Sequence, residues 1–245
     1  MIDFTVAEWA AWAPGLSQRD HWQAWALEPT LPHGEDTPAL TEVPAMQRRR
    51  MERLGRMAVQ VACWCAPATE ASNGSIPLVF ASRHGDVQRS FELLDNLARN
   101  EPMSPTQFGL SVHNAIAALY SIVRGERGNY IALAAGRSTA EAAIVEAAAL
   151  LADGAPEVLV VVYDAQPPQV YAGFLDEPDP FYAWSWRLRS GGEGARISLT
   201  SAPAEAGPGA TGLPHGLDVL RFLLSGDSEL NHHADGIAWT WRRRA

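Results

Sequence analysis

The middle of the chain alternates short apolar runs with amphipathic stretches, and this alternation constrains the fold more than any other feature. Three apolar runs have the length of buried strands: residues 75–81, 130–135 and 158–163. Three stretches have the apolar spacing of helices: residues 86–100, 104–123 and 138–151. Strands that alternate with helices predict an α/β layered fold built on one sheet.

The N-terminal flank has a different character. The first 40 residues are rich in tryptophan and proline, which predicts irregular segments that tryptophan side chains hold against a core. Residues 44–65 then show helical spacing of apolar side chains and predict a helix. Cys63 and Cys65 lie at the end of that helix, where we expect buried structural thiols.

The C-terminal flank, after Asp164, predicts a few smaller elements. Residues 181–189 and 196–201 resemble two strands paired across the glycine-rich turn 190–194. Two more elements are predicted beyond a linker rich in alanine, proline and glycine: a helix at residues 217–224 and a strand at residues 236–241.

Composition excludes several classes of protein. All 19 basic residues are arginine, so no lysine is present for Schiff-base chemistry or for a P-loop. Two cysteines, separated by one residue, exclude a disulfide scaffold and a multi-cysteine zinc site. The net charge of -9 argues against nucleic acid as a partner. No apolar run reaches the roughly 18 residues of a membrane span, so we expect a cytoplasmic protein without one.

Side chains with catalytic potential are few. Residues 136–140 (GRSTA) come nearest to a nucleophile elbow but lack its final glycine. Ser138 is equally well placed as a helix N-cap, and we favour that interpretation. His113 is interpreted as a hydrogen-bonded core residue. The adjacent His232 and His233 point to opposite sides, and no ligand spacing predicts a metal site or a cofactor.

An ordered series of sequence blocks resembles the N-terminal half of β-ketoacyl synthases. The blocks are residues 48–58 (RRRMERLGRMA), 79–85 (VFASRHG), 103–115 (MSPTQFGLSVHNA), 131–147 (IALAAGRSTAEAAIVEA) and 157–164 (EVLVVVYD). The series is most similar to short subunits of the chain-length-factor type in aryl polyene and xanthomonadin-like pigment pathways. The resemblance implies a truncated thiolase-like α/β/α fold. Residues 1–165 would be its N-terminal half, and residues 166–245 a reduced C-terminal half of the same domain.

The resemblance also implies that the catalytic cysteine and histidines of the family are missing. Active ketosynthases carry the acyl chain on a cysteine at the turn between a core strand and the next helix, where the helix N-terminus lowers the thiol pKa. On the family pattern Arg137 occupies that position, or Gly136 if the register shifts by one, and neither side chain forms a thioester. The family's two catalytic histidines belong to the C-terminal half, and three histidines here lack a matching context: His215, His232 and His233. The chain would therefore not be an enzyme by itself.

A partner follows from the resemblance, because ketosynthases of this kind work as two-fold dimers. Residues 130–135 would pair with the partner's equivalent strand, and the helix that begins at Ser104 would line the seam. The implied interface and acyl-tunnel wall comprises Phe108, Val112, His113, Asn114, Ile116, Tyr130, Ala132, Ala134 and Arg137. Two roles for Arg137 remain open: a bond across the interface, or a salt bridge within the chain.

Three functions are therefore weighed. The leading one is a non-catalytic subunit that stabilises an active β-ketoacyl-ACP synthase in polyene chain elongation, shapes its acyl tunnel and meets acyl carrier protein through the complex. The alternative is an acyl-thioester hydrolase that uses Ser138, with His113 or His84 as base. The third is a stand-alone module that binds acyl carrier protein. The acidic charge of the chain disfavours this third function, because carrier proteins are acidic too.

Overall fold

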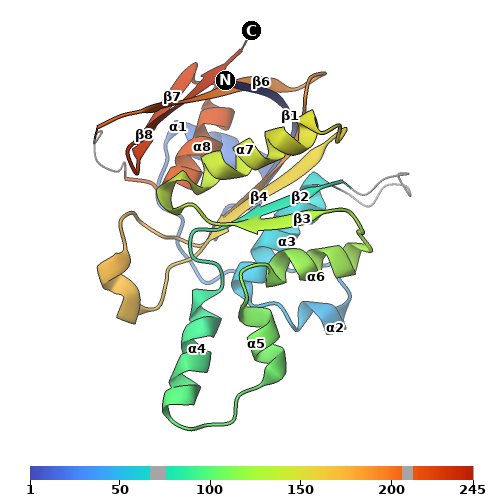
Figure 1. Cartoon of the computed structure of the whole chain (residues 1–245), viewed down its shortest axis with the longest axis vertical. Helices are drawn as coiled ribbons and strands as arrows, with labels where there is room; N and C mark the ends of the chain where they lie inside the picture. The colour runs from blue at the N-terminus through green and yellow to red at the C-terminus, as the bar shows by residue number, and fades with distance from the viewer. Residues whose placement is uncertain (67–75, 206–211, 245) are drawn as a thin grey trace.

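One mixed β-sheet with helices on both faces forms the body of the protein (Figure 1). The computed structural model describes residues 1–66, 76–205 and 212–244. The described strands follow the order β3-β2-β4-β5-β1-β6-β8-β7 across the sheet. Their bounds are β1 Ile2–Trp12, β2 Leu78–Ala81, β3 Tyr130–Leu133, β4 Val158–Asp164, β5 Tyr182–Arg189, β6 Ala195–Pro203, β7 Glu229–Ala234 and β8 Ile237–Arg243. The predicted α/β class is confirmed.

The helices divide between the two faces. The described helices are α1 Arg19–Leu27, α2 Ala45–Arg48, α3 Arg53–Cys65, α4 Val87–Ala98, α5 Pro105–Ser111, α6 Ala115–Arg124, α7 Thr139–Ala152 and α8 His215–Ser225, with 3₁₀ turns η1 Gly136–Ser138 and η2 Gln169–Phe174. One apolar cluster joins α1, α7 and α8 to the sheet, and another joins α3 and α6 to it. Every residue of β2 and of β4 is buried, as expected of strands covered on both faces.

The N-terminal expectation is wrong at its start. Instead of irregular segments, the chain begins with the strand β1, which lies between β5 and β6. Since Pro14 is the first proline, nothing interrupts a strand before it. The two strands predicted near residues 181–201 exist, but β1 separates them, so they do not form the predicted hairpin.

Two predicted long helices are each divided in two. The stretch at residues 44–65 forms α2 and α3, and the stretch at residues 104–123 forms α5 and α6. Val112 follows α5 in an extended conformation, with ψ of 147°, which ends that helix. Strand β7 was not predicted, because its sequence, ELNHHA, is too polar to look like a strand.

Two segments project from the body of the molecule. Helices α4 and α5 form a hairpin at one end of the molecule, and η2 projects beside α4 (Figure 1). We call residues 165–181, between β4 and β5, the strap. None of the described helices is long and apolar enough to cross a membrane.

Candidate functional site

The turn after β3 is the place where the sequence predicts the vacated nucleophile position. Gly136 begins this turn with a positive φ of 53°, a conformation that favours glycine. The Thr139 hydroxyl accepts a hydrogen bond from the Ala135 N–H (3.0 Å) and donates one to the Gly136 carbonyl (2.7 Å). Thr139 therefore stabilises the turn.

Ser138 does not act as predicted. It occupies the N-cap position of α7, but its side chain makes no capping hydrogen bond. Its hydroxyl oxygen instead accepts a hydrogen bond from the Trp239 indole N–H at 3.1 Å. The expectation that this side chain binds backbone N–H groups is wrong, because β8 brings an indole donor that competes for the same oxygen.

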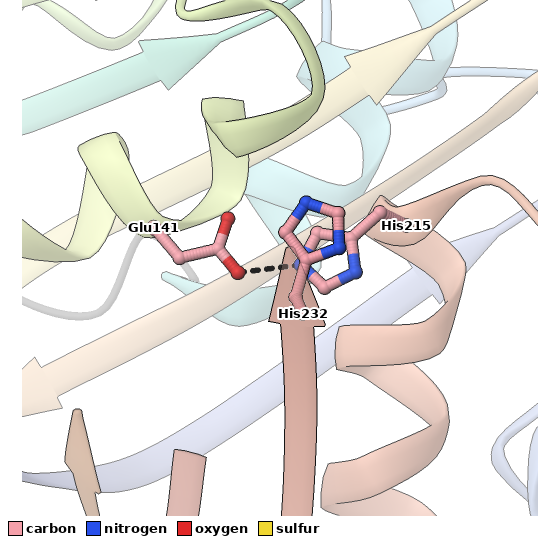
Figure 2. A group of neighbouring side chains, drawn as sticks. All are labelled: Glu141, His215 and His232. Atoms are coloured by element: carbon pink, nitrogen blue, oxygen red, sulfur yellow. Dashed lines mark hydrogen bonds and ion pairs between the residues drawn. The ribbon is translucent and has the colours of Figure 1, made fainter. Parts of the chain in front are cut away.

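Two histidines from the C-terminal segment lie beside this turn, in a group with Glu141 of α7 that we call the histidine cluster (Figure 2). His215, at the start of α8, places Nε2 at 2.5 Å from the Glu141 carboxylate. The ring of His232, on β7, stacks on that of His215, with centroids 3.4 Å apart and 8° between the planes. His232 Nε2 lies 3.1 Å from the Arg137 carbonyl, and the Trp241 indole donates to Glu141 at 2.9 Å.

The charges within the histidine cluster follow from its burial. Burial alone would raise the pKa of Glu141, but the charge and hydrogen bond of His215 outweigh it and lower that pKa. Burial would likewise lower the pKa of His215, yet Glu141 raises it. Burial, with the neighbouring charge of His215, lowers the pKa of His232 to about 4. These shifts favour an ionised Glu141 that pairs with a protonated His215, beneath a neutral His232.

These three side chains have the chemistry of metal ligands, and their ligand atoms lie within 4.8 Å of one another. A metal ion lies close to the plane of any imidazole that binds it. Two rings stacked in parallel 3.4 Å apart therefore cannot both bind one ion unless one ring turns. The cluster, as it stands, is an ion pair with a stacked imidazole.

Arg137 forms its ion pair within the chain. Its Nε lies 3.8 Å from the carboxylate of Asp176, a strap residue just after η2. Both side chains are partly exposed, so solvent weakens this pair. Of the two roles left open by the sequence, the local salt bridge is present in the structure.

A second buried group of charges lies at the carboxyl end of β2, and we call it the arginine cluster. Arg83 is buried there and pairs with three strap carboxylates, those of Asp176, Glu177 (2.6 Å) and Asp179 (2.7 Å). Beside it, Asp164 accepts hydrogen bonds from the Ser82 hydroxyl (2.8 Å) and the Arg83 N–H (2.9 Å). Burial raises the pKa of Asp164 to about 7, although both neighbours oppose the shift.

The two cysteines are buried and poorly placed to react. Both are buried on α3, as predicted, and Cys65 lies 3.5 Å from the carbonyl of Glu8. Burial raises the pKa of each thiol to about 11. Since the thiolate is the nucleophile, neither is an acyl acceptor at neutral pH.

The histidines proposed as a base for Ser138 lie elsewhere. His113 bonds to the Ser82 carbonyl at 3.0 Å, and His84 lies 3.6 Å from Asp179. Within residues 1–66, 76–205 and 212–244, no hydrogen bond joins either one to Ser138. The position of His113 fits its interpretation as a hydrogen-bonded structural residue.

The residues predicted for the interface divide into exposed and buried ones. Ile116 is buried against α3. Arg137 and His113 are partly buried, as is Ala132 on β3. The others are exposed: Phe108, Val112, Asn114, Tyr130 and Ala134.

The comparisons with known proteins identify the family. The model of the β-ketoacyl synthase N-terminal domain matches residues 22–242, nearly the whole chain. The chain belongs to this family. The match extends well past residue 165, where the sequence resemblance was expected to end, and it includes both histidines of the cluster.

Solved structures agree with the family. One chain of the complex between ketosynthase ApeO and its chain length factor ApeC from Xenorhabdus doucetiae is 28% identical, with a TM-score of 0.83 over 99% of this chain and 100% of that one. The ishigamide ketosynthase/chain length factor is 14% identical, with a TM-score of 0.65 over 83% of this chain and 68% of that one. A β-ketoacyl synthase from Burkholderia phymatum is 14% identical, with a TM-score of 0.60 over 83% and 65%. A search of curated proteins found no match.

The ketosynthase-family chain therefore has a thiolase-like fold and resembles chain-length-factor subunits, as its sequence blocks implied. Sequence reasoning missed the histidine cluster, because His215, His232 and Glu141 are far apart in the chain. One signal was present. Trp239 and Trp241 are two residues apart on a strand and so share a face, and that face turns toward α7.

Proposed function

We propose that this chain is a non-catalytic, chain-length-factor-like subunit that heterodimerises with an active β-ketoacyl-ACP synthase. In the complex it stabilises the ketosynthase and shapes the tunnel that holds the growing polyene chain. Acyl carrier protein reaches the complex through the active subunit. The similarity to a chain of a ketosynthase–chain length factor complex, over its full length, supports this role.

One observation carries the non-catalytic part of the proposal. The turn at residues 136–138 holds no thiol, and both cysteines are buried on α3 with raised pKa values. The side chains around the turn already have partners within the chain. Glu141 pairs with His215, and the Ser138 hydroxyl accepts a hydrogen bond from the Trp239 indole. A thioester has no acceptor there, and the histidine that could move a proton is held by a buried carboxylate.

Among the described strands, β3 forms one edge of the sheet, and this edge supports the proposed pairing with a partner subunit. The carbonyls of Asn129 and Leu133 accept hydrogen bonds from the side of β2. Because backbone polar groups of a strand alternate in direction, those of Tyr130 and Ala132 point to the unpaired edge. Such an edge is a ready template for another strand, and a two-fold arrangement would pair it with its equivalent in antiparallel fashion.

The tunnel wall is assigned to exposed apolar side chains of the α4–α5 hairpin. Phe108 of α5 is 60% exposed, and Val112 directly after α5 is exposed too. Contiguous patches of exposed apolar side chains mark surfaces that bind a partner. In the proposed complex Phe108 and Val112 limit how far the acyl chain extends.

Co-purification with a ketosynthase of an aryl polyene pathway tests the proposal. We expect a heterodimer by mass measurement, malonyl-dependent elongation by the complex and no elongation by this chain alone. Ala132→Pro removes an N–H that points to the free edge, and proline is tolerated on an edge strand, so this variant should fold but fail to co-purify. Elongation by the lone chain, or a wild-type chain that does not co-purify, would contradict the proposal.

A further inference from the structure

The strap exposes large apolar side chains at its η2 turn. Val170 is 63% exposed and Phe174 is 77% exposed. Between them Tyr171 packs on Phe91 of α4, with ring centroids 6.2 Å apart, and on Phe174 at 6.3 Å. Leu94, one turn further along α4, is exposed as well. Figure 1 shows this part of the strap projecting beside α4. We call these five side chains the strap surface.

Charge ties the middle of the strap to the body, while its two end residues pack against the apolar core. Its residues Asp176, Glu177 and Asp179 all pair with the buried Arg83. Glu177 also accepts the N–H of His215 at 3.1 Å. Burying an arginine with carboxylates brings little net stability, whereas it fixes the geometry of the groups involved. The arginine cluster therefore holds exposed apolar side chains in one arrangement, as expected of a preorganised binding surface.

The strap surface continues from the edge at which the partner is proposed to bind. Arg137, in the turn directly after β3, pairs with Asp176 of the strap, just after η2. The arginine cluster itself lies at the carboxyl end of β2, the neighbour of β3 in the sheet. A subunit that pairs with β3 and extends past its carboxyl end therefore meets the strap.

We propose that the strap surface is a second contact site for the active ketosynthase subunit, with Val170 and Phe174 inserted into an apolar pocket of that partner. This inference rests on the proposed function and adds a second binding element to strand pairing. Aromatic and aliphatic side chains at the centre of a patch, with charges at its rim, match the anatomy of a protein–protein interface.

Charge distinguishes this partner from two others. The strap has no basic residue of its own, and of its three carboxylates only that of Asp176 is half exposed, because Glu177 and Asp179 are buried against Arg83. An acidic carrier protein would be repelled by the chain's net charge of -9. A second copy of this chain would meet the same repulsion. The expected partner surface is apolar and carries no excess of negative charge.

The double variant Val170→Ser/Phe174→Ser tests the site in the full chain. Both side chains are exposed, so the thermal melt should stay unchanged. We expect binding to the ketosynthase, measured by titration calorimetry, to weaken at least tenfold. The matched control is Leu27→Ser/Met46→Ser, which removes two equally exposed apolar side chains on α1 and α2 and should bind as wild type does.

The outcomes separate this inference from the proposed function. If Ala132→Pro abolishes binding while the strap variant binds like wild type, the heterodimer stands and the strap site is wrong. The strap site is also wrong if the variant loses only carrier-protein binding or only self-association. If the wild-type chain does not bind the ketosynthase at all, the proposed function fails before the strap is tested.

Discussion

The histidine cluster and the arginine cluster flank the same turn, yet their charges are arranged in opposite ways. In the histidine cluster one carboxylate meets one protonated imidazole, and the remaining imidazole is neutral. In the arginine cluster a single guanidinium meets three carboxylates, with Asp164 close by. The first group is balanced and joins α7 to the C-terminal segment. The second has an excess of carboxylates and holds a surface segment.

This difference matches what each cluster holds in place. The histidine cluster lies beside the turn at residues 136–138 and links α7 to α8 and β7. The arginine cluster is buried and ties down the strap, where the exposed apolar side chains lie. One side of the turn is thus joined to the C-terminal segment, and the other to the segment that carries exposed apolar side chains.

Removal of the only carboxylate of the histidine cluster should have the largest effect. Glu141→Gln keeps an acceptor for Trp241 but leaves His215 without a buried counter-charge. We expect the free energy of unfolding at about pH 5.5, where His215 is protonated, to fall by about 3 kcal/mol. Urea unfolding checks this, with Glu146→Gln on the same helix as the control, because Glu146 forms no ion pair in the described part of the chain. Equal stabilities of the two variants would contradict the assigned charges.

The net pH dependence should come from two groups whose contributions have opposite sign. His232, whose pKa is lowered from 6.5 to about 4, is neutral in the fold and protonated in the unfolded chain between pH 4.5 and 6.5, so its contribution to stability rises with pH. Between pH 4.5 and 6.5 the Glu141–His215 pair keeps its full contribution, since the Glu141 pKa is lowered from 4.5 and the His215 pKa is raised from 6.5. In the same window Asp164, whose pKa is raised from 3.8 to about 7, stays protonated in the fold and ionises in the unfolded chain. That group therefore lowers stability by about 1.4 kcal/mol per pH unit as pH rises.

Asp164→Asn should remove that slope. The difference in unfolding free energy between variant and wild type should grow in favour of the variant from pH 4.5 to 6.5, measured by urea unfolding at several pH values. Asp153→Asn, at an exposed position after α7, serves as the control and should leave the slope unchanged. Parallel curves for Asp164→Asn and wild type would show that Asp164 ionises normally.

A smaller effect is expected when the arginine cluster loses one of its carboxylates. Asp179→Asn leaves Arg83 with Asp176 and Glu177 and preserves an oxygen acceptor. We expect a loss below about 1 kcal/mol, the net value of one weakened hydrogen bond. Compared with Glu141→Gln in the same assay, this substitution measures how much the excess of carboxylates matters. If Asp179→Asn lost more stability than Glu141→Gln, the arginine cluster would be the more sensitive of the two clusters, contrary to expectation.

The smallest effect should come from Ser138. Ser138→Ala leaves the partly buried Trp239 indole without its acceptor, and we expect a loss of about 0.5 kcal/mol by thermal melt. The wild-type serine should not react with a fluorophosphonate probe, because no histidine in the described ranges hydrogen-bonds to it. Labelling that disappears in Ser138→Ala would instead favour the hydrolase.

Much of the fold was predictable, because it follows from local patterns. The runs at residues 78–81 and 158–164 are apolar on both faces and became central parallel strands. Ser104 caps α5 as its sequence indicates, with its hydroxyl accepting from the Gln107 N–H. Strand β1 was missed because the first 40 residues as a whole are rich in proline. The eleven residues of β1 all precede the first of those prolines.

The site was less predictable, because its contacts join distant parts of the chain. Arg137 was recognised from its place in the family pattern, but no local pattern links it to Asp176. No role was predicted for His215 or His232, because the side chains that contact them are far away in the chain. The pairing of β7 with β8, and of β8 with β6, places His232 beside α7, and the packing of α8 on α7 places His215 there.

The insertion of β1 between β5 and β6 has a consequence for how the protein is made. Strand β1 pairs with β5 and β6, which are synthesised much later than β1 itself. Until then its apolar side chains, Phe4 and Val6 among them, have no sheet in which to be buried. Such long-range pairing slows folding and exposes the nascent chain to aggregation. The centre of the sheet therefore forms only after residues 182–203 have been synthesised.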